Sequence, residues 1–308
     1  MLKLQDAVKK FYIRCVAMGM SEKTLINYRY QFKAFNTFLN ARDIAYMENI
    51  TGEDVRAYLA YMRAKGYAPD TIKDRYVGLN TFFGFLYSEG LVPINPVKVV
   101  KKPKLPKVRA RTFTTTELQK LLGFFREDSF VGLRNKLMIF IFYGTGIRKA
   151  ELLGLSVLNL HLDMSMMTII GKGNKERDVP LSSSLVKLLR RYLDRRADLL
   201  LDTRMETSAL FVTNRGTPLT DGALLHIFRE LKAGTGISGR RVSPHTFRHS
   251  FAKNFLLNGG ELFVLQEILG HEDVSTTRIY VDYNKRELGQ QMQSYCPLDN
   301  VKWSYLNS

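Results

Sequence analysis

Six polar residues in the later part of the chain could together carry out one reaction. They are two arginines, a lysine, two histidines and a tyrosine, namely Arg148, Lys172, His245, Arg248, His271 and Tyr280. The set lacks a pair of carboxylates for a catalytic metal, and its spacing supports no serine–histidine–acid triad. It suits attack by a tyrosine hydroxyl on a phosphodiester, because bidentate arginines can neutralise the charge that builds up on the phosphoryl oxygens. We therefore expect neither a metal ion nor a cofactor.

The other members of the set would handle protons. The departing sugar oxygen needs a proton, which Lys172 could supply if its pKa were lowered. A tyrosine ordinarily has a pKa of about 10, so cations and histidines near Tyr280 would have to remove its proton or stabilise the phenolate. The product would be a phosphotyrosine that conserves the bond energy, so rejoining would need no ATP.

Each of these residues also has an ordinary structural interpretation. Arg148 follows a Gly-Thr-Gly turn and lies three residues before Glu151. The two could form a surface ion pair, or Glu151 could hold the guanidinium toward a phosphate. Lys172 lies between two glycines and could simply be solvated, and Tyr280 could be a packed aromatic residue.

The histidines have structural alternatives as well. His245 and His249 are four residues apart and could bind a metal ion, but HTFRH lacks the glutamate of the H-E-x-x-H zinc motif. The intervening Arg248 also disfavours a cation. His271 comes directly after a Leu-Gly pair and could be a C-terminal helix cap.

Four stretches taken together resemble the tyrosine recombinase (phage integrase) family and are most similar to its Xer-type members. They are GTGIRKAELLGL at 144–155, GKGNKER at 171–177, HTFRHSFA at 245–252 and LGHEDVSTTRIYV at 269–281. The resemblance implies that all six residues are catalytic, with Tyr280 rather than Tyr283 as the nucleophile. It also implies that Glu151 orients Arg148 and that His249 has a more structural role.

The resemblance implies a site-specific recombinase. Such an enzyme cleaves duplex DNA, leaves a 3′-phosphotyrosyl link and a 5′-hydroxyl, and exchanges strands through a Holliday junction. It assembles as a tetramer on two DNA sites, each a specific inverted-repeat core site, and a second recombinase or an accessory protein is a possible partner. The role stays open between chromosome-dimer resolution, phage integration or excision, transposon movement and integron cassette exchange.

Three other interpretations share parts of this pattern. A type IB topoisomerase nicks and rejoins DNA by similar chemistry, but the compact helical N-terminal domain and the Xer-like motifs argue against it. A telomere resolvase would be a longer chain. A catalytically idle DNA-binding regulator would lack one of the catalytic residues, and all of them are present in this sequence.

The segment before the motifs predicts a helical domain over residues 1–97. Ser21 can cap a helix that extends to residue 40, and Thr51 with Asp54 resembles a capping box. Asp70 can cap a further helix that stops at Gly90. With the opening helix this makes four, and the resemblance assigns them to a SAM-like core-binding domain.

Residues 98–112 predict a basic, extended linker. Prolines in and just before this segment break any helix, and a solvated tether is the alternative to DNA contact. The candidate DNA-binding residues are six cationic side chains: Lys101, Lys102, Lys104, Lys107, Arg109 and Arg111.

A mainly α catalytic domain with a small β-hairpin is predicted over residues 113–289. Thr114 and Glu117 form a capping box, and two strand-like runs flank the Gly-Lys-Gly-Asn turn that carries Lys172. Helices are predicted elsewhere, including one over 285–293. The family implies a two-domain C-shaped clamp on DNA, with a tail over 290–308 that docks on a neighbouring protomer or, alternatively, packs on its own chain.

The composition agrees with a nucleic-acid partner. The chain has 308 residues, with 46 Lys and Arg against 29 Asp and Glu, a net charge of +17. Nucleic acid is therefore the first candidate partner and a membrane surface the second. No apolar run is long enough to span a membrane and the N-terminus does not resemble a signal peptide, so we expect a cytoplasmic protein. Cys15 and Cys296 are too far apart to suggest a disulfide framework or a zinc cluster.

Overall fold

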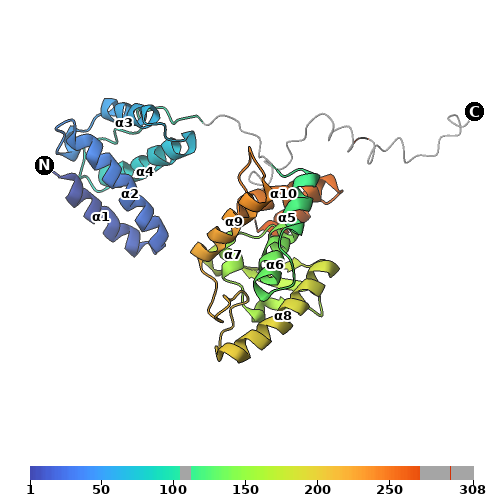
Figure 1. Cartoon of the computed structure of the whole chain (residues 1–308). Coiled ribbons are helices and arrows are strands. Elements are labelled where there is room, and N and C mark those ends of the chain that lie inside the picture. The colour runs from blue at the N-terminus through green and yellow to red at the C-terminus, as the bar shows by residue number, and fades with distance from the viewer. Residues whose placement is uncertain (105–111, 271–291, 293–308) are drawn as a thin grey trace, which may run out of the picture. The chain divides into compact units, whose positions relative to one another are not determined.

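The protein consists of two compact units, Met1–Val108 and Arg109–Ser308, which we describe separately (Figure 1). A computed structural model describes residues 1–104, 112–270 and 292. Helices dominate both units and a small sheet lies in the second, so the predicted mainly α fold with a small β-hairpin is confirmed. No helix in the described ranges is long and apolar enough to cross a membrane.

The first unit is a bundle of α-helices with an aromatic core. Its helices are α1 (Leu4–Ala17), α2 (Glu22–Asn40), α3 (Gly52–Ala64) and α4 (Pro69–Ser88), with a short 3₁₀ turn, η1 (Met47–Asn49). Phe11, Phe32 and Phe82 are buried and meet at ring-centroid distances of 4.5–5.6 Å. Such aromatic pairs stabilise a core beyond their buried area.

Two of the three predicted caps in this unit are confirmed, and the third is wrong. Ser21 caps α2, and Thr51 and Asp54 form a reciprocal capping box at the start of α3. The helix α4 begins two residues earlier than predicted, at Pro69, so Asp70 lies inside its first turn. Proline is favoured at the first helical position because its φ is already helical and it has no N–H group to satisfy.

The beginning of the predicted linker is packed rather than extended. Val100 is buried in the core of the first unit, as is Val97 just before the predicted linker, and the Tyr76 hydroxyl donates a hydrogen bond of 2.9 Å to the Val100 carbonyl. Directly after them, Lys101 and Lys102 are exposed, as is Lys104. The other candidate DNA-binding residues, Lys107, Arg109 and Arg111, lie outside the described residues.

The second unit combines helices with one antiparallel sheet. The strands β1 (Leu160–His161), β2 (Met166–Ile170) and β3 (Glu176–Pro180) lie in the order β1-β2-β3. The helices are α5 (Thr115–Gly123), α6 (Phe130–Thr145), α7 (Lys149–Leu153), α8 (Ser183–Thr203), α9 (Asp221–Thr235), α10 (Pro244–Leu257) and α11 (Leu262–Leu269). The capping box predicted at Thr114 and Glu117 starts α5 and is confirmed.

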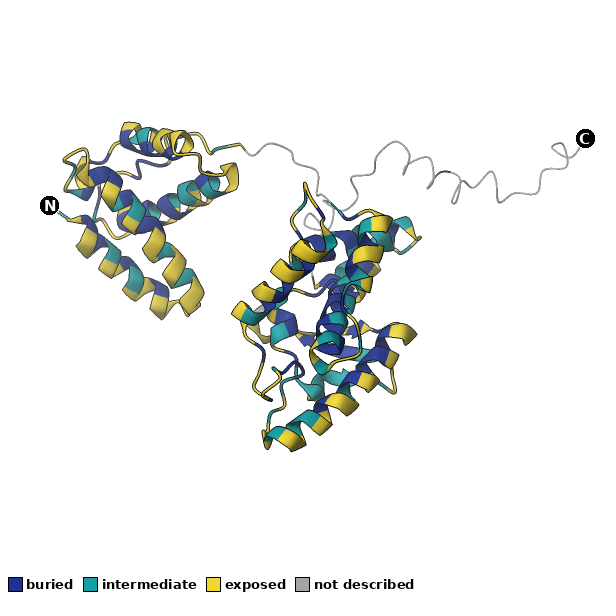
Figure 2. Cartoon of the chain, in the orientation of Figure 1, coloured by how far each residue is buried: buried dark blue, intermediate teal, exposed yellow. Residues whose placement is uncertain are grey.

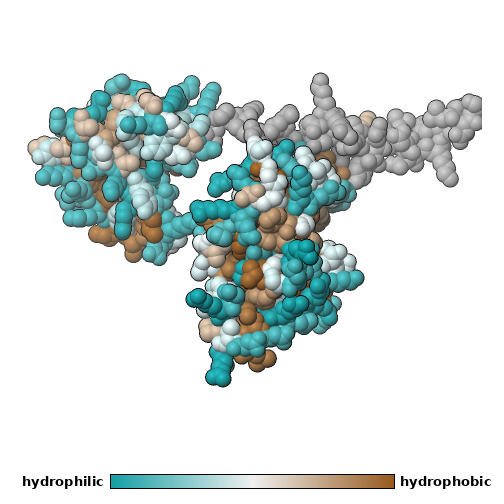
Figure 3. Space-filling view, in the orientation of Figure 1, coloured by the Kyte–Doolittle hydropathy of each residue, from teal (hydrophilic) through white to brown (hydrophobic). Residues whose placement is uncertain are grey.

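Helix α6 is the buried centre of this unit. It is apolar on most faces and packs against α8 and α10, and buried residues follow it through the interior of the unit (Figure 2). A helix that is apolar all round is favoured only where neighbours cover it on every side. Hydrophilic side chains cover most of the visible outer surface of both units (Figure 3).

The predicted hairpin is present and has a buried face. Strand β2 pairs with β3, and Ile169 lies opposite Arg177 while Met167 lies opposite Val179. The two strands are joined by η3 (Lys172–Asn174), in which Gly173 has a φ of +75° that favours glycine. The hairpin therefore places Lys172 in its turn, as the sequence predicts. The helix predicted over 285–293 and the tail over 290–308 lie outside the described residues except Met292.

Candidate active site

Gly146 ends helix α6 and brings three segments together. It adopts a φ of +65°, and a Cβ atom at this position would lie 2.5 Å from Phe251 and 2.8 Å from Leu269. Gly144 and Thr145 belong to α6 itself, so the predicted Gly-Thr-Gly turn is in fact a single left-handed residue. The close approach sets the end of α6 against α10 and α11, and Arg148 follows two residues later.

Arg148 stands at the N-terminus of α7 and is held by Glu151. The Glu151 carboxylate accepts hydrogen bonds from the backbone N–H of Arg148 at 2.7 Å and from its Nη1 at 2.8 Å. Only 5% of the Glu151 side chain is exposed, against 46% of the Arg148 side chain. Glu151 is therefore a buried anchor rather than half of a surface ion pair, and the arginine keeps a solvent-facing side.

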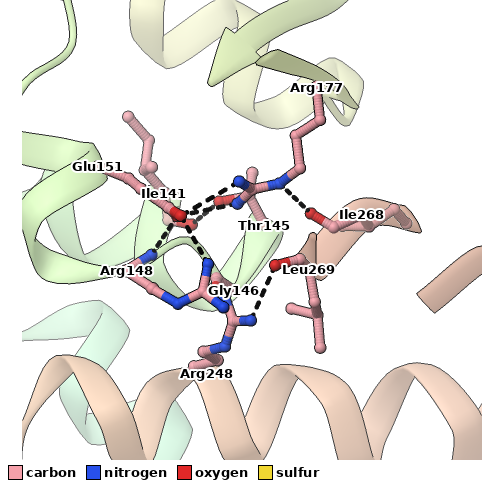
Figure 4. Close-up of polar contacts among 9 residues, drawn as sticks. All are labelled: Ile141, Thr145, Gly146, Arg148, Glu151, Arg177, Arg248, Ile268 and Leu269. Atoms are coloured by element: carbon pink, nitrogen blue, oxygen red, sulfur yellow. Dashed lines mark hydrogen bonds and ion pairs between the residues drawn. The ribbon is translucent and has the colours of Figure 1, made fainter. Parts of the chain in front are cut away.

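The same carboxylate also receives Arg177 from strand β3. Arg177 donates from Nη1 to Glu151 Oε1 at 3.1 Å and from Nη2 to Oε2 at 2.8 Å (Figure 4). Burial alone would raise the pKa of Glu151, but the hydrogen bonds from Arg177 and Arg148 outweigh it and lower that pKa to about 2. Glu151 is thus ionised across the physiological range, and two guanidinium groups share its charge.

Arg248 is buried and binds backbone carbonyls. It comes from α10, donates from Nη1 to the Gly146 carbonyl at 2.7 Å, and donates from Nη2 to the Leu269 carbonyl at 2.9 Å. Only 4% of the Arg248 surface is exposed. Arg248 therefore joins the end of α6, close to Arg148, to the end of α11, two residues before His271 (Figure 4).

The two histidines of α10 are in contact with each other. His245 Nε2 and His249 Nε2 are 2.8 Å apart, so one ring donates a hydrogen bond to the other. Partial burial, together with Arg248 and Arg241, lowers the pKa of His245. His245 is accordingly neutral near pH 7. No group of three or more His, Cys, Asp or Glu side chains that could hold a metal gathers anywhere in the described ranges.

The structure brings part of the predicted set together. Arg148, Glu151 and Arg248 meet where α6 and α11 end, whereas Lys172 is placed only by its backbone in the hairpin turn. His271 and Tyr280 lie outside the described residues, and so does Tyr283. The roles of all of these residues remain predictions.

Arg177 is the residue of this cluster that the sequence analysis did not single out. It lies within the GKGNKER stretch, where it resembles one more surface cation of a basic turn. One signal could have identified it: in β3 it shares a strand face with Val179, which is fully buried. A charged residue on a core-facing strand position needs a buried partner of opposite charge.

Comparisons with known proteins agree with the division of the chain into two units. Residues 111–287 match the phage integrase family, and residues 10–90 match the N-terminal SAM-like domain of phage integrases.

The chain belongs to the phage integrase family.

Its relatives include Xer recombinases. It is 32% identical to tyrosine recombinase XerD of Oceanobacillus iheyensis over 296 residues, which cover 96% of this chain and 99% of that protein. It is 32% identical to tyrosine recombinase XerC of Thermodesulfovibrio yellowstonii over 282 residues, or 91% and 92% of the two chains. The predicted membership of an Xer-like tyrosine recombinase family is confirmed, and with it an enzyme of site-specific DNA recombination that cleaves and rejoins strands.

Solved structures of similar fold include two protein–DNA complexes. XerH bound to palindromic difH substrate in a post-cleavage complex has a TM-score of 0.74 and 23% identity, covering 95% of this chain and 84% of that one. A lambda integrase dimer bound to a COC′ core site has a TM-score of 0.74 and 20% identity, covering 92% and 80%. At these identities the likeness establishes the fold.

Proposed function

We propose that this recombinase attacks one strand of a duplex at a specific site with Tyr280 and remains joined to the DNA through a 3′-phosphotyrosyl link. The observation that carries the proposal is the anchoring of two arginines from separate helices at one place. Arg148 is held by a buried carboxylate and Arg248 by two carbonyls. Preorganised cations of this kind stabilise charge that develops on a phosphoryl group in the transition state.

The division of labour between the arginines follows from their exposure. Arg148 is half-exposed and spends one terminal nitrogen on Glu151, so the remaining edge of its fork can meet a phosphate oxygen. Arg248 is buried and already donates to the Gly146 and Leu269 carbonyls. It contributes positive charge from below the surface and holds α11 in place ahead of His271.

The proton transfers complete the reaction. The Tyr280 oxygen forms a bond to phosphorus as the bond from phosphorus to the 5′ oxygen breaks. The leaving 5′ oxygen takes a proton from the Lys172 ammonium, and the tyrosine proton passes to a neutral imidazole, for which His245 is the candidate. The lowered pKa of His245 suits this role because it keeps the ring neutral near pH 7. Rejoining is the reverse sequence.

The DNA partner we propose is a duplex with an inverted-repeat core site on which protomers assemble, four on two sites in the complete reaction. The net charge of +17 and the exposed Lys101, Lys102 and Lys104 support contact with a polyanion. A palindromic substrate and a dimer on a core site occur in the XerH and lambda integrase complexes of the same fold. Symmetric half-sites match symmetric protein assemblies.

A suicide substrate tests the proposal. Duplexes drawn from the DNA flanking the gene are nicked near the cleavage position, so that the fragment released on cleavage diffuses away and the covalent intermediate accumulates. Wild type and Tyr280→Phe are compared on a denaturing gel. We expect an adduct from wild type and none from the variant, with equal DNA binding.

Two outcomes would contradict the proposal. An adduct that persists in Tyr280→Phe would exclude Tyr280 as the nucleophile. Relaxation of supercoiled plasmid without any Holliday junction or exchange product would favour the topoisomerase alternative over recombination.

A further inference from the structure

Arg177 has an unusual environment for an arginine in a hairpin. Only 13% of its side chain is exposed, and all three guanidinium nitrogens donate hydrogen bonds. Nη1 and Nη2 grip the Glu151 carboxylate, and Nε donates to the Ile268 carbonyl at 2.8 Å (Figure 4). A fork that fits a carboxylate on one edge and a carbonyl on another is a geometry that lysine cannot reproduce.

The surroundings of Arg177 are shaped to admit it. Gly270 has a φ of +62°, and a Cβ atom there would lie 2.9 Å from Arg177 Cδ and 3.0 Å from its Nη1. The backbone at the end of α11 therefore lies directly against this side chain. Along β3, Arg177 takes the core-facing position that precedes the buried Val179. Burying a guanidinium is costly unless its hydrogen bonds are satisfied, so this position is occupied for a reason other than hydrophobic packing.

Arg177 joins three segments that each carry or precede a predicted catalytic residue. Its own hairpin carries Lys172, and its carboxylate partner Glu151 holds Arg148. Its carbonyl partner Ile268 lies at the end of α11, three residues before His271. These segments are far apart in sequence, and the single side chain of Arg177 bonds directly to two of them and belongs to the third.

We infer that Arg177 is a positioning residue for the cleavage reaction, which locks the Lys172 hairpin, the Arg148 turn and the end of α11 into one geometry. The inference rests on the proposed function for its catalytic consequence. Arg177 also changes the local charge: Arg148 and Glu151 alone would be neutral, whereas the three together carry one positive charge. A site that stabilises negative charge as it develops on a phosphoryl group benefits from that surplus.

Hydrogen exchange tests the mechanical part of the inference without any DNA. Three backbone amides report on the three segments: Arg148 N donates to Glu151, Gly171 N to the Lys175 carbonyl, and Gly270 N to the Glu267 carbonyl. In the full chain, Arg177→Met should speed exchange at all three by about tenfold or more, the factor expected when charge-assisted hydrogen bonds are lost. Faster exchange at Gly171 alone would overturn the inference.

Arg196 provides a matched control in the same unit. It is a buried arginine of α8 that donates to the carbonyls of Thr207, Ala209 and Leu210. Arg196→Met should speed exchange at the Leu210 amide, which donates to the Leu155 carbonyl, and should leave the three reporters of the site unchanged. If Arg196→Met opened those reporters as much as Arg177→Met, Arg177 would be an ordinary stabilising residue.

Single-turnover cleavage tests the catalytic part. On a nicked duplex that wild type cleaves, Arg177→Met should bind with an unchanged Kd but form the covalent adduct about a hundredfold more slowly, because small displacements of catalytic groups have effects of this size. Arg177→Lys keeps the buried positive charge but loses the forked guanidinium geometry. This variant should fold, and it should cleave about tenfold more slowly than wild type. A wild-type cleavage rate in either variant would overturn the inference.

A double-mutant comparison separates positioning through Glu151 from a general loss of stability. If Arg177 acts through that carboxylate, Arg177→Met should slow cleavage much less in a Glu151→Gln background than in wild type. If Arg177→Met slowed cleavage by the same factor in both backgrounds, Arg177 would not act through Glu151. Absence of an adduct from wild type on DNA that it binds would count against the proposed function instead, and hydrogen exchange would then decide the positioning role by itself.

Discussion

At the level of single residues, the two arginines of the site differ in what they support. Arg148 is half-exposed, and if its side chain were removed, Arg177 would still neutralise the Glu151 carboxylate. Arg248 is buried and donates hydrogen bonds to two backbone carbonyls. Removing either should weaken stabilisation of a phosphoryl group, but only Arg248 also holds the fold together.

This difference predicts separable effects on stability and activity. Arg148→Ala should slow adduct formation by about a hundredfold to a thousandfold and change the free energy of unfolding by less than about 1 kcal/mol. Arg248→Ala should slow the reaction as well and lower the free energy of unfolding by about 2 kcal/mol or more, because two buried carbonyls lose donors. Urea unfolding and single-turnover cleavage measure the two effects. Equal stability losses would contradict the distinction.

Glu151 makes the free energy of unfolding depend on pH, with less stability in acid. Its pKa is lowered from an ordinary 4.5 to about 2 in the folded protein. A depressed folded pKa contributes stability above the unfolded value, and that stability is lost as the pH falls from about 4.5 toward 2, on the order of 3 kcal/mol in total. In urea unfolding, the free energy of unfolding of Glu151→Gln should therefore fall less between pH 6 and pH 3 than that of wild type. An equal fall in both proteins would show that Glu151 is not the group responsible.

At the level of elements, backbone conformation at helix ends sets where the predicted catalytic side chains lie. Gly146 and Gly236 both end a helix in the left-handed region, with φ values of +65° and +63°. They differ in surroundings: a Cβ atom on Gly146 would collide with Phe251 and Leu269, whereas nothing lies within 4 Å of one on Gly236.

This pair makes a controlled test of the junction between α6, α10 and α11. Gly236→Ala should lower the free energy of unfolding by about 1 kcal/mol through backbone strain alone, with cleavage unchanged. Gly146→Ala should lower the free energy of unfolding by about 1–3 kcal/mol more than Gly236→Ala does, because the added methyl group overpacks the junction. It should also slow cleavage, because the Gly146 carbonyl that accepts a hydrogen bond from Arg248 must move. Thermal unfolding and the adduct assay measure both variants. Equal behaviour would mean that the close approach at Gly146 does not matter.

Local patterns in the sequence were sufficient for most elements but not for the connections between them. The caps at Ser21, Thr51 and Thr114 and the Lys172 turn depend on neighbouring residues, so the sequence predicts them. Asp70 was misassigned because Pro69, one residue earlier, competes for the same helix start. The packing of Val100 depends on contacts distant in sequence, which local periodicity does not encode.

The sequence predicts which residues belong to the candidate site, but not most of the hydrogen bonds that hold them in place. Residue types, spacing and the family resemblance singled out Arg148, Glu151 and Arg248 as candidates. The acceptors that hold Arg248 are backbone carbonyls of Gly146 and Leu269, and every residue type has such a group. Arg177 was overlooked for a related reason: a lone cation in a basic turn has no distinguishing local pattern until the strand register places it on the buried face.

At the level of the whole molecule, the positive charge governs how the protein meets DNA. The net charge of +17 predicts that duplex affinity falls steeply and linearly on a logarithmic scale between about 50 and 200 mM salt, as counterions are released from phosphates. Replacing Lys101, Lys102 and Lys104 with glutamine should reduce the slope by up to about 3, since each phosphate contact contributes about 0.9. Fluorescence anisotropy with a labelled duplex measures both slopes. A flat salt response of the wild type would argue against phosphate-dominated contact.

The proposed reaction requires that one tyrosine of this chain becomes covalently joined to DNA, and mapping that bond identifies the nucleophile. The adduct formed on a nicked duplex would be digested with nuclease and protease, and the peptide that retains a nucleotide would be sequenced by mass spectrometry. We expect a nucleotide on Tyr280. A nucleotide on the neighbouring Tyr283 or on any other residue would contradict it.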